Sequence, residues 1–136
     1  MLLVDFHVHF RKDQCTHSLL CRQKDHKLIS PLPFFHIYGF LASLLYCGWR
    51  GQELITMSDR FDLPTFCKLV EDHKPDRAHL VPPIILGLAK HPIVDKFDLS
   101  SMKMIISAAA PLGKDTEDAA RKRLGSDVKQ AWGMSE

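Results

Sequence analysis

The stretch that decides the fold is residues 104–125, Met-Ile-Ile-Ser-Ala-Ala-Ala-Pro-Leu-Gly-Lys-Asp-Thr-Glu-Asp-Ala-Ala-Arg-Lys-Arg-Leu-Gly. It begins with Met104-Ile105-Ile106, a short apolar run of the kind found in buried parallel strands. Small residues and a proline follow. Lys114 to Leu124 then shows the spacing of an amphipathic helix that ends at Gly125. A buried strand, a tight turn and a helix form the repeating unit of a parallel α/β sheet.

The same alternation of strands and helices extends toward both ends of the chain. Further strands are predicted within residues 28–33, 53–57, 77–81 and 128–132, and further helices at 40–49, 63–73 and 84–90. The helix at 40–49 is apolar nearly all round, which predicts that it is buried. The predicted fold class is therefore α/β: a partial, largely parallel sheet flanked by helices, as part of a larger domain.

Composition and charge narrow the class of protein. The 136 residues are 46% hydrophobic and 25% charged, with a formal net charge of +2, as in ordinary globular chains. The densest basic run, at 121–123, follows Glu117 and Asp118 and is interpreted as a solvated helix face, so no nucleic-acid partner is expected. The apolar stretch at 31–49 contains prolines and a histidine, which favours a buried strand and helix over a membrane span.

The four cysteines form no Cys-x-x-Cys pair, and two of them lie among apolar residues. They are Cys15, Cys21, Cys47 and Cys67. This pattern favours free thiols in a reducing, intracellular compartment, such as the cytoplasm or the peroxisome.

Residues 1–24 differ from the rest of the chain. Apolar and polar residues alternate from Val4 to Phe10, which predicts a half-buried strand. Within it, Asp5, His7 and His9 resemble the first metal-binding strand of amidohydrolase barrels, because two histidines at period two point the same way and can share one Zn²⁺. That fold needs further ligands on later strands and about 250 residues. Stoichiometric bound zinc would revive this alternative.

Four stretches between residues 32 and 136 carry groups that are suited to ligand binding or catalysis. Leu32 to Gly39 places a histidine and a tyrosine in an aromatic wall that suits an apolar acid, although a histidine such as His36, taken alone, is more often a satisfied core histidine. Ser107 to Lys114 offers small residues that allow a flat ligand to approach the backbone. Gln130 to Glu136 sets a hydroxyl beside a carboxylate, as for a phosphate and its Mg²⁺. Arg60, in the turn at 59–63, is suited to an anionic group.

In this order, and with Val81 to Ile84 and Phe97 to Ser101 between them, these stretches resemble the adenylate-forming superfamily over residues 25–136. The branch that they resemble most contains 4-coumarate–CoA ligases, fatty acyl-CoA synthetases and firefly luciferase. The resemblance implies a ligase that joins an aryl or fatty carboxylic acid to ATP with Mg²⁺. It also implies transfer of the acyl group from the resulting acyl-AMP to coenzyme A.

The resemblance also assigns residues to roles. His36, Ser135 and Glu136 are expected at the catalytic centre, with Glu136 as the Mg²⁺ carboxylate. Tyr38, Ser43 and Ala109 are expected to line the acid pocket, and Arg60 to contact coenzyme A. The positions expected to bind the nucleotide are Ala109, Ala110, Pro111, Gln130, Ala131, Trp132, Gly133, Met134 and Ser135.

Departures from the family pattern modify this expectation. Alanine stands at Ala108 and Ala131, where family members usually have glycine, and a methyl group there is expected to crowd the nucleotide or strain the turn. Residues 1–24 contain no Ser/Thr/Gly-rich phosphate loop, and the chain stops at Glu136, inside the last motif. We therefore expect a fragment that is inactive alone, with a non-catalytic remnant or binding fragment as the alternative.

Overall fold

The computed structural model describes residues 26–57 and 60–131, which hold a five-stranded sheet in the order β2-β1-β3-β4-β5. All four strand pairings are parallel. The strands are β1 (Lys27–Ile29), β2 (Glu53–Ile55), β3 (Arg77–Leu80), β4 (Met104–Ser107) and β5 (Asp127–Gln130). The predicted α/β class with a parallel sheet is confirmed. Each strand expected between residues 28 and 131 is present; β4 is one residue longer than the predicted run 104–106, and the other four are shorter than predicted.

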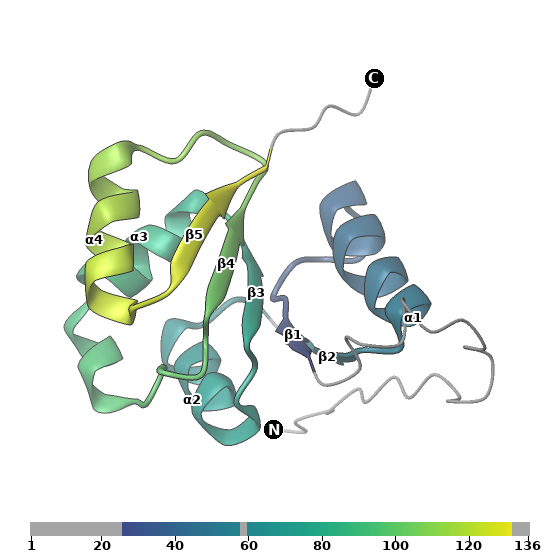
Figure 1. Ribbon diagram of the computed structural model, residues 1–136, viewed down its shortest axis with the longest axis horizontal. Helices are drawn as coiled ribbons and strands as arrows, with labels where there is room; N and C mark the ends of the chain where they lie inside the picture. The colour runs from purple at the N-terminus through teal and green to yellow at the C-terminus, as the bar shows by residue number, and fades with distance from the viewer. Residues whose placement is uncertain (1–25, 58–59, 132–136) are drawn as a thin grey trace.

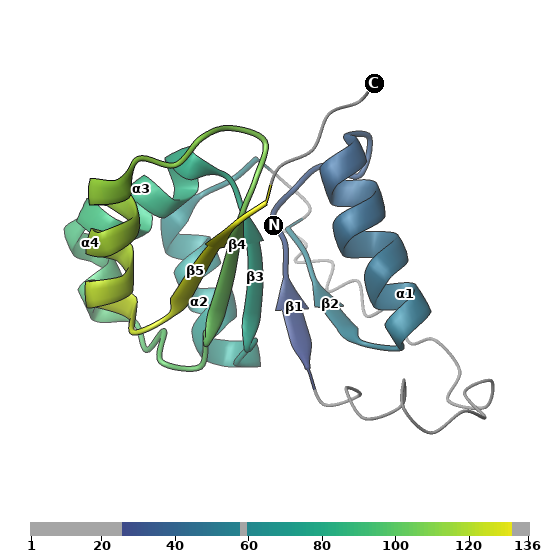
Figure 2. The same ribbon diagram turned by 45° about the horizontal axis from the view of Figure 1, so that its top comes forward.

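Helices lie on both faces of the sheet (Figures 1 and 2). On one face a π-helix, η3 (Tyr38–Leu45), continues into α1 (Tyr46–Arg50) over β1 and β2. The opposite face is covered by α2 (Leu63–His73), α3 (Pro82–Lys90) and α4 (Lys114–Leu124). A 3₁₀ turn, η4 (Pro92–Lys96), follows α3 where the sequence predicted only a helix end at Pro92.

The helix boundaries follow from local capping. Asp62 precedes α2 and its carboxylate accepts hydrogen bonds from the Thr65 amide at 3.0 Å and the Thr65 hydroxyl at 2.7 Å, as expected of an N-cap residue. Gly125 ends α4 and Gly51 ends α1, with φ of 67° and 63° in the left-handed region that glycine tolerates. These local rules explain why the predicted limits of α2 and α4 match the structure.

Alternation along the strands divides the apolar side chains between two cores. The larger core takes Ile29, Ala78 and Ile105 from the sheet and packs them against Phe66 and other residues of α2, α3 and α4. The smaller core contains Leu28, Leu54 and Cys47, between the sheet and η3–α1. A fully buried side chain of this size contributes about 1.5–3 kcal/mol through the hydrophobic effect. Most of the packing energy therefore lies on the side of α2, α3 and α4.

The prediction that the helix at 40–49 is buried is wrong for most of its surface. Ser43 and Cys47, one turn apart, face the sheet and are buried. Phe40, Leu45 and Trp49 are 41%, 46% and 68% exposed. The reason is positional, because η3–α1 covers only the β1–β2 side of the sheet and no described element packs on its outer side. No helix in the described ranges is both long enough and apolar enough to cross a membrane.

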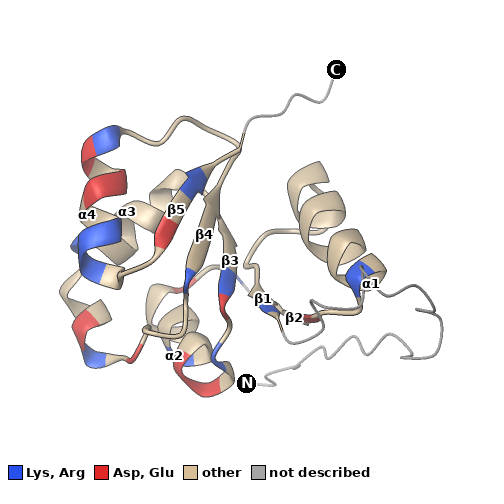
Figure 3. Cartoon of the chain, in the orientation of Figure 1, with Lys and Arg blue, Asp and Glu red and all other residues tan. Residues whose placement is uncertain are grey.

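Charged residues of both signs occur along α4, and η3 contains none (Figure 3). Within α4, Arg121 forms an ion pair with Glu117 at 2.9 Å, one helical turn earlier. The basic run at 121–123 is thus accompanied by acidic neighbours, as the interpretation of a solvated helix face predicts. The strand expected from Val4 to Phe10 lies outside the described residues.

Candidate functional site

Several predicted site residues lie at the carboxyl ends of the parallel strands, which together form the carboxyl-terminal edge of the sheet. In the parallel register Leu80 pairs with Ser107, and Ser107 with Gln130, so β3, β4 and β5 end side by side. The loop at 108–113 therefore leaves the sheet next to Gln130 and Ala131. Open α/β sheets bind ligands at this edge. The structure thus brings together the second stretch and the first two residues of the third, Gln130 and Ala131.

Tyr38 connects the first stretch to the same edge. Its hydroxyl donates a hydrogen bond to the carbonyl oxygen of Ile106 at 3.0 Å and lies 3.5 Å from the carbonyl oxygen of Leu80. Burial raises the pKa of the Tyr38 phenol well above its usual value, so the hydroxyl stays a donor at neutral pH. The hydroxyl of Tyr38 is therefore engaged with the backbone of β3 and β4, close to the ends of these strands.

A buried cluster of polar side chains packs against the Tyr38 ring. The Tyr38 ring stacks on His79, with centroids 5.8 Å apart and planes inclined by 22°. His79 Nδ1 lies 3.2 Å from Ser43 Oγ, which is 2.8 Å from Ser30 Oγ. Burial, assisted by the nearby charge of Arg77, lowers the pKa of His79 from 6.5 to about 4. The imidazole is therefore neutral near pH 7, and Ser43 is a buried support for Tyr38.

His79 and Ser30 were not identified from the sequence. The signal that points to them is the period of two along a strand: Ala78 and Leu80 face the large core, so His79 between them faces η3. In the sheet register Ile29 pairs with Ala78, which places Ser30 beside His79. A histidine in a strand that is buried on both faces needs a hydrogen-bonding partner, and Ser43 supplies it.

His36 is exposed at the start of η3, and its ring is oriented by the backbone. His36 Nδ1 accepts a hydrogen bond from the Tyr38 amide at 3.1 Å. A neutral imidazole whose Nδ1 accepts carries its proton on Nε2, so Nε2–H is the free donor. Arg60 is an exposed residue of the turn between β2 and α2. His36 therefore lies next to Tyr38, and nothing in the described contacts brings Arg60 to them.

The loop after β4 exposes backbone beside small side chains. Ala109, Ala110 and Pro111 are all exposed. Ala109 has φ of 73°, a left-handed conformation that is unfavourable for an L-residue. Among the described residues only Lys74 and Ala109 combine a side chain with positive φ, so the backbone is not strained in this way at Ala108 or Ala131. The strain lies one residue further along than the sequence suggested. The expected crowding of the nucleotide by the methyl groups of Ala108 and Ala131 stays a prediction.

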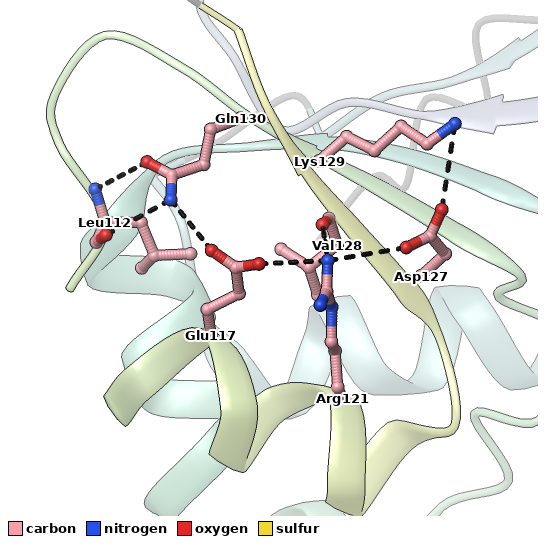
Figure 4. A network of polar contacts seen from close by, with 7 residues as sticks. All are labelled: Leu112, Glu117, Arg121, Asp127, Val128, Lys129 and Gln130. Carbon is pink, nitrogen blue, oxygen red and sulfur yellow. Dashed lines mark hydrogen bonds and ion pairs between the residues drawn. The ribbon is translucent and has the colours of Figure 1, made fainter. Parts of the chain in front are cut away.

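A network of polar contacts closes this loop onto β5 and α4 (Figure 4). Gln130 Oε1 accepts a hydrogen bond from the Leu112 amide at 3.2 Å, and Gln130 Nε2 donates to the Leu112 carbonyl at 3.3 Å. Nε2 also donates to Glu117 Oε2 at 2.8 Å. Arg121 forms an ion pair with the other oxygen, Glu117 Oε1, and donates a hydrogen bond to the Val128 carbonyl at 2.6 Å. The Gln130 side chain is thus directed toward the protein.

Several predicted residues lie outside the described ranges. Trp132, Gly133, Met134, Ser135 and Glu136 are among them, as are the histidines of the zinc alternative. Within residues 26–57 and 60–131 no group of three or more His, Cys, Asp or Glu side chains is placed to hold a metal ion. The expected roles of Ser135 at the catalytic centre and of Glu136 as the Mg²⁺ carboxylate stay predictions.

Comparison with known proteins finds similarity to AMP-binding enzymes and to 4-coumarate–CoA ligases. The profile of the AMP-binding enzyme family matches residues 5–136. The chain is 46% identical over 110 residues to 4-coumarate:CoA ligase 1 of Petunia hybrida and 44% identical over 110 residues to 4-coumarate–CoA ligase 1 of Petroselinum crispum. Each alignment covers 80% of this chain and 20% of the relative, so the chain spans about a fifth of their length.

Solved structures agree with the sequence relatives. A natural red-emitting luciferase from Phrixothrix hirtus matches with a TM-score of 0.73 and 31% identity, covering 81% of this chain and 26% of the luciferase. The predicted boundary near residue 25 stays a prediction. Because the family profile matches nearly all of the sequence, the chain belongs to the AMP-binding enzyme family.

Proposed function

We propose that this chain supplies the acid-binding wall and the adenylate-binding edge of an acid–CoA ligase. In that reaction a carboxylate oxygen attacks the α-phosphorus of ATP, pyrophosphate leaves, and an acyl-AMP is formed. The thiol of coenzyme A then attacks the acyl carbon, loses its proton and displaces AMP. The observation that carries the proposal is the hydrogen bond from the Tyr38 hydroxyl to the Ile106 carbonyl, because Ile106 lies two residues before the start of the loop at 108–113.

The acid is proposed to be an arylacrylate-type acid such as 4-coumarate. The relatives from Petunia hybrida and Petroselinum crispum are named as 4-coumarate ligases, and both match 80% of this chain. A flat ring fits against Tyr38, which is held in one orientation by His79 and by the Ile106 carbonyl. His36, whose Nε2–H is available, is proposed to donate to the carboxylate of the acid.

The nucleotide is proposed to lie along the loop after β4 and the end of β5. Ala109, Ala110 and Pro111 offer exposed backbone to a flat base. Ala131 is exposed, and its amide donates to the Ser107 carbonyl at 2.8 Å. A ligand would therefore contact the exposed side of Ala131 and not its amide. The positions at 132–135, Glu136 for Mg²⁺ and Arg60 for coenzyme A complete the proposal. A bound Mg²⁺ would neutralise phosphate charge during attack by the acid.

Two measurements test this function. In the first, the 136-residue chain is assayed for 4-coumarate-dependent exchange of pyrophosphate into ATP. We expect none, since the chain spans only 20% of the length of the ligases that it resembles. Exchange above the level of a Ser135→Ala, Glu136→Ala control would show that the chain is active alone.

The second measurement supplies the remainder of a ligase. The matched 110-residue segment of the petunia ligase is replaced by the corresponding segment of this chain, and the same exchange is measured. Exchange that depends on 4-coumarate and is lost in His36→Ala supports the proposal. A folded chimera that activates no acid, tested with aryl and fatty acids, would refute it.

A further inference from the structure

The hydrogen-bonding capacity of Gln130 is nearly used up within the protein. A primary amide has two N–H donors and one oxygen acceptor with two lone pairs. Both donors of Nε2 are engaged, one by the Leu112 carbonyl and one by Glu117 Oε2, and Oε1 accepts from the Leu112 amide. One lone pair of Oε1 is all that is left. The side chain of Gln130 therefore has no free donor for a bound nucleotide.

The orientation of this amide is dictated by its partners. The Leu112 N–H requires an oxygen opposite it, while the Leu112 carbonyl and the Glu117 carboxylate both require a donor. Exchanging the nitrogen and oxygen of Gln130 would set like groups against each other at all three contacts. Glu117 is itself held, because its other oxygen accepts from Arg121, which also donates to the Val128 carbonyl.

The element that these contacts hold is the strained one. Leu112 lies three residues after Ala109, whose φ of 73° costs energy in an L-residue. A strained backbone persists only where its surroundings fix it. The paired hydrogen bonds between Gln130 and both backbone groups of Leu112 are such a restraint, and Glu117 at the first turn of α4 aligns the amide that makes them (Figure 4).

We propose that Gln130 is a positioning residue, which acts on the nucleotide through the loop at 108–113 and whose side chain donates no hydrogen bond to it. Glu117 and Arg121 belong to the same hydrogen-bonded network. The functional half of this inference rests on the proposed function, since it takes the loop as the adenylate-binding edge. The structural half, that Gln130 fastens the loop, stands without it.

The structural half is tested by amide hydrogen exchange at Leu112, measured by NMR on the full chain without ligand. Gln130→Met keeps the length of the side chain and removes its hydrogen bonds. We expect exchange at Leu112 to accelerate about tenfold, as for a lost hydrogen bond of about 1.4 kcal/mol. Lys129→Met is the matched control on the same strand, and it should leave Leu112 unchanged. Unchanged exchange in Gln130→Met would overturn the inference.

The functional half is tested by titrating AMP into the same proteins. Glu117→Met removes the partner that aligns the amide, and Glu117 itself is directed toward Gln130 and Arg121. Both Gln130→Met and Glu117→Met should weaken AMP binding several-fold, and both should accelerate exchange at Leu112. If only Gln130→Met weakens binding, Gln130 contacts the nucleotide directly and the positioning role is wrong. If the wild-type chain binds no AMP, the proposed function loses support, and Leu112 exchange alone decides whether Gln130 fastens the loop.

Discussion

The hydroxyl of Tyr38 donates to the carbonyl oxygen of Ile106 at 3.0 Å, across 68 residues of sequence. This bond joins the start of the exposed helix η3 to the centre of the sheet, between β3 and β4. It also fixes the plane of the ring that we propose as the wall of the acid pocket. Loss of the bond should therefore affect both stability and the acid site.

The first prediction concerns that hydroxyl. Tyr38→Phe removes the donor and leaves the partly buried Ile106 carbonyl without it, which should lower the free energy of unfolding by about 1–2 kcal/mol. Urea denaturation followed by fluorescence measures the change. Tyr46→Phe is the matched control, because the Tyr46 hydroxyl bonds to no described residue. Equal effects of the two changes would contradict the prediction.

The second prediction is a dependence of stability on pH that comes from His79. In the unfolded chain this imidazole protonates near pH 6.5, whereas in the folded chain its pKa is about 4. Between these values the unfolded state binds the extra proton, so the free energy of unfolding falls as the pH is lowered from 6.5 to 4. At about 1.4 kcal/mol per pKa unit the loss is about 3 kcal/mol.

Urea denaturation at several pH values tests this slope. His79→Gln should flatten it, while His91→Asn, a change at an exposed imidazole, should keep it. The carboxyls of Asp62 and Asp98 act at lower pH, because hydrogen bonds from Thr65 and Ser100 lower their pKa values below 3.8. A slope that persists unchanged in His79→Gln would show that another group causes it.

The third prediction sets two glycines against each other. A Cβ added at Gly39 would lie 2.4 Å from the Pro33 carbonyl oxygen, a backbone atom that cannot move aside cheaply. Gly39→Ala should therefore cost about 1–3 kcal/mol and displace the start of η3. At Gly87 in α3 the nearest atom is Leu63 Cδ2 at 3.6 Å, an ordinary contact.

Gly87→Ala should accordingly stabilise the chain by about 0.5–1 kcal/mol, through the better helix propensity of alanine. Thermal unfolding of both variants, monitored by circular dichroism at 222 nm, gives the comparison. Shifts of the same sign would be inconsistent with the close approach of Gly39 to Pro33.

The fourth prediction tests the left-handed residue in the loop after β4. A β-branched side chain is strongly disfavoured at positive φ, so Ala109→Val should destabilise the chain by about 1–2 kcal/mol more than Ala110→Val. Both positions are exposed, which makes packing differences small. Chemical denaturation of the two variants under identical conditions provides the measurement. If they unfold at the same urea concentration, Ala109 does not adopt the left-handed conformation in solution.

Local signals in the sequence determined the secondary structure where neighbouring residues supply the energy. Asp62 caps α2 through Thr65, three residues away, and Gly125 ends α4 because it tolerates positive φ. Both signals lie within one or two helical turns of the helix end that they set. The limits of these helices, and the parallel α/β class that follows from their alternation with strands, were therefore predictable.

Tertiary structure alone decided which elements meet. The strand order β2-β1-β3-β4-β5, the exposure of Trp49, and the contact of Tyr38 with His79 all depend on packing between distant segments. From the sequence we expected a strained turn or a crowded nucleotide at Ala108 and Ala131, and a nucleotide contact at Gln130. In the folded chain Ala109 has the positive φ, and the Gln130 side chain bonds to Leu112. Only the pairing of β4 with β5 brings Gln130 and Leu112, 18 positions apart, within reach of each other.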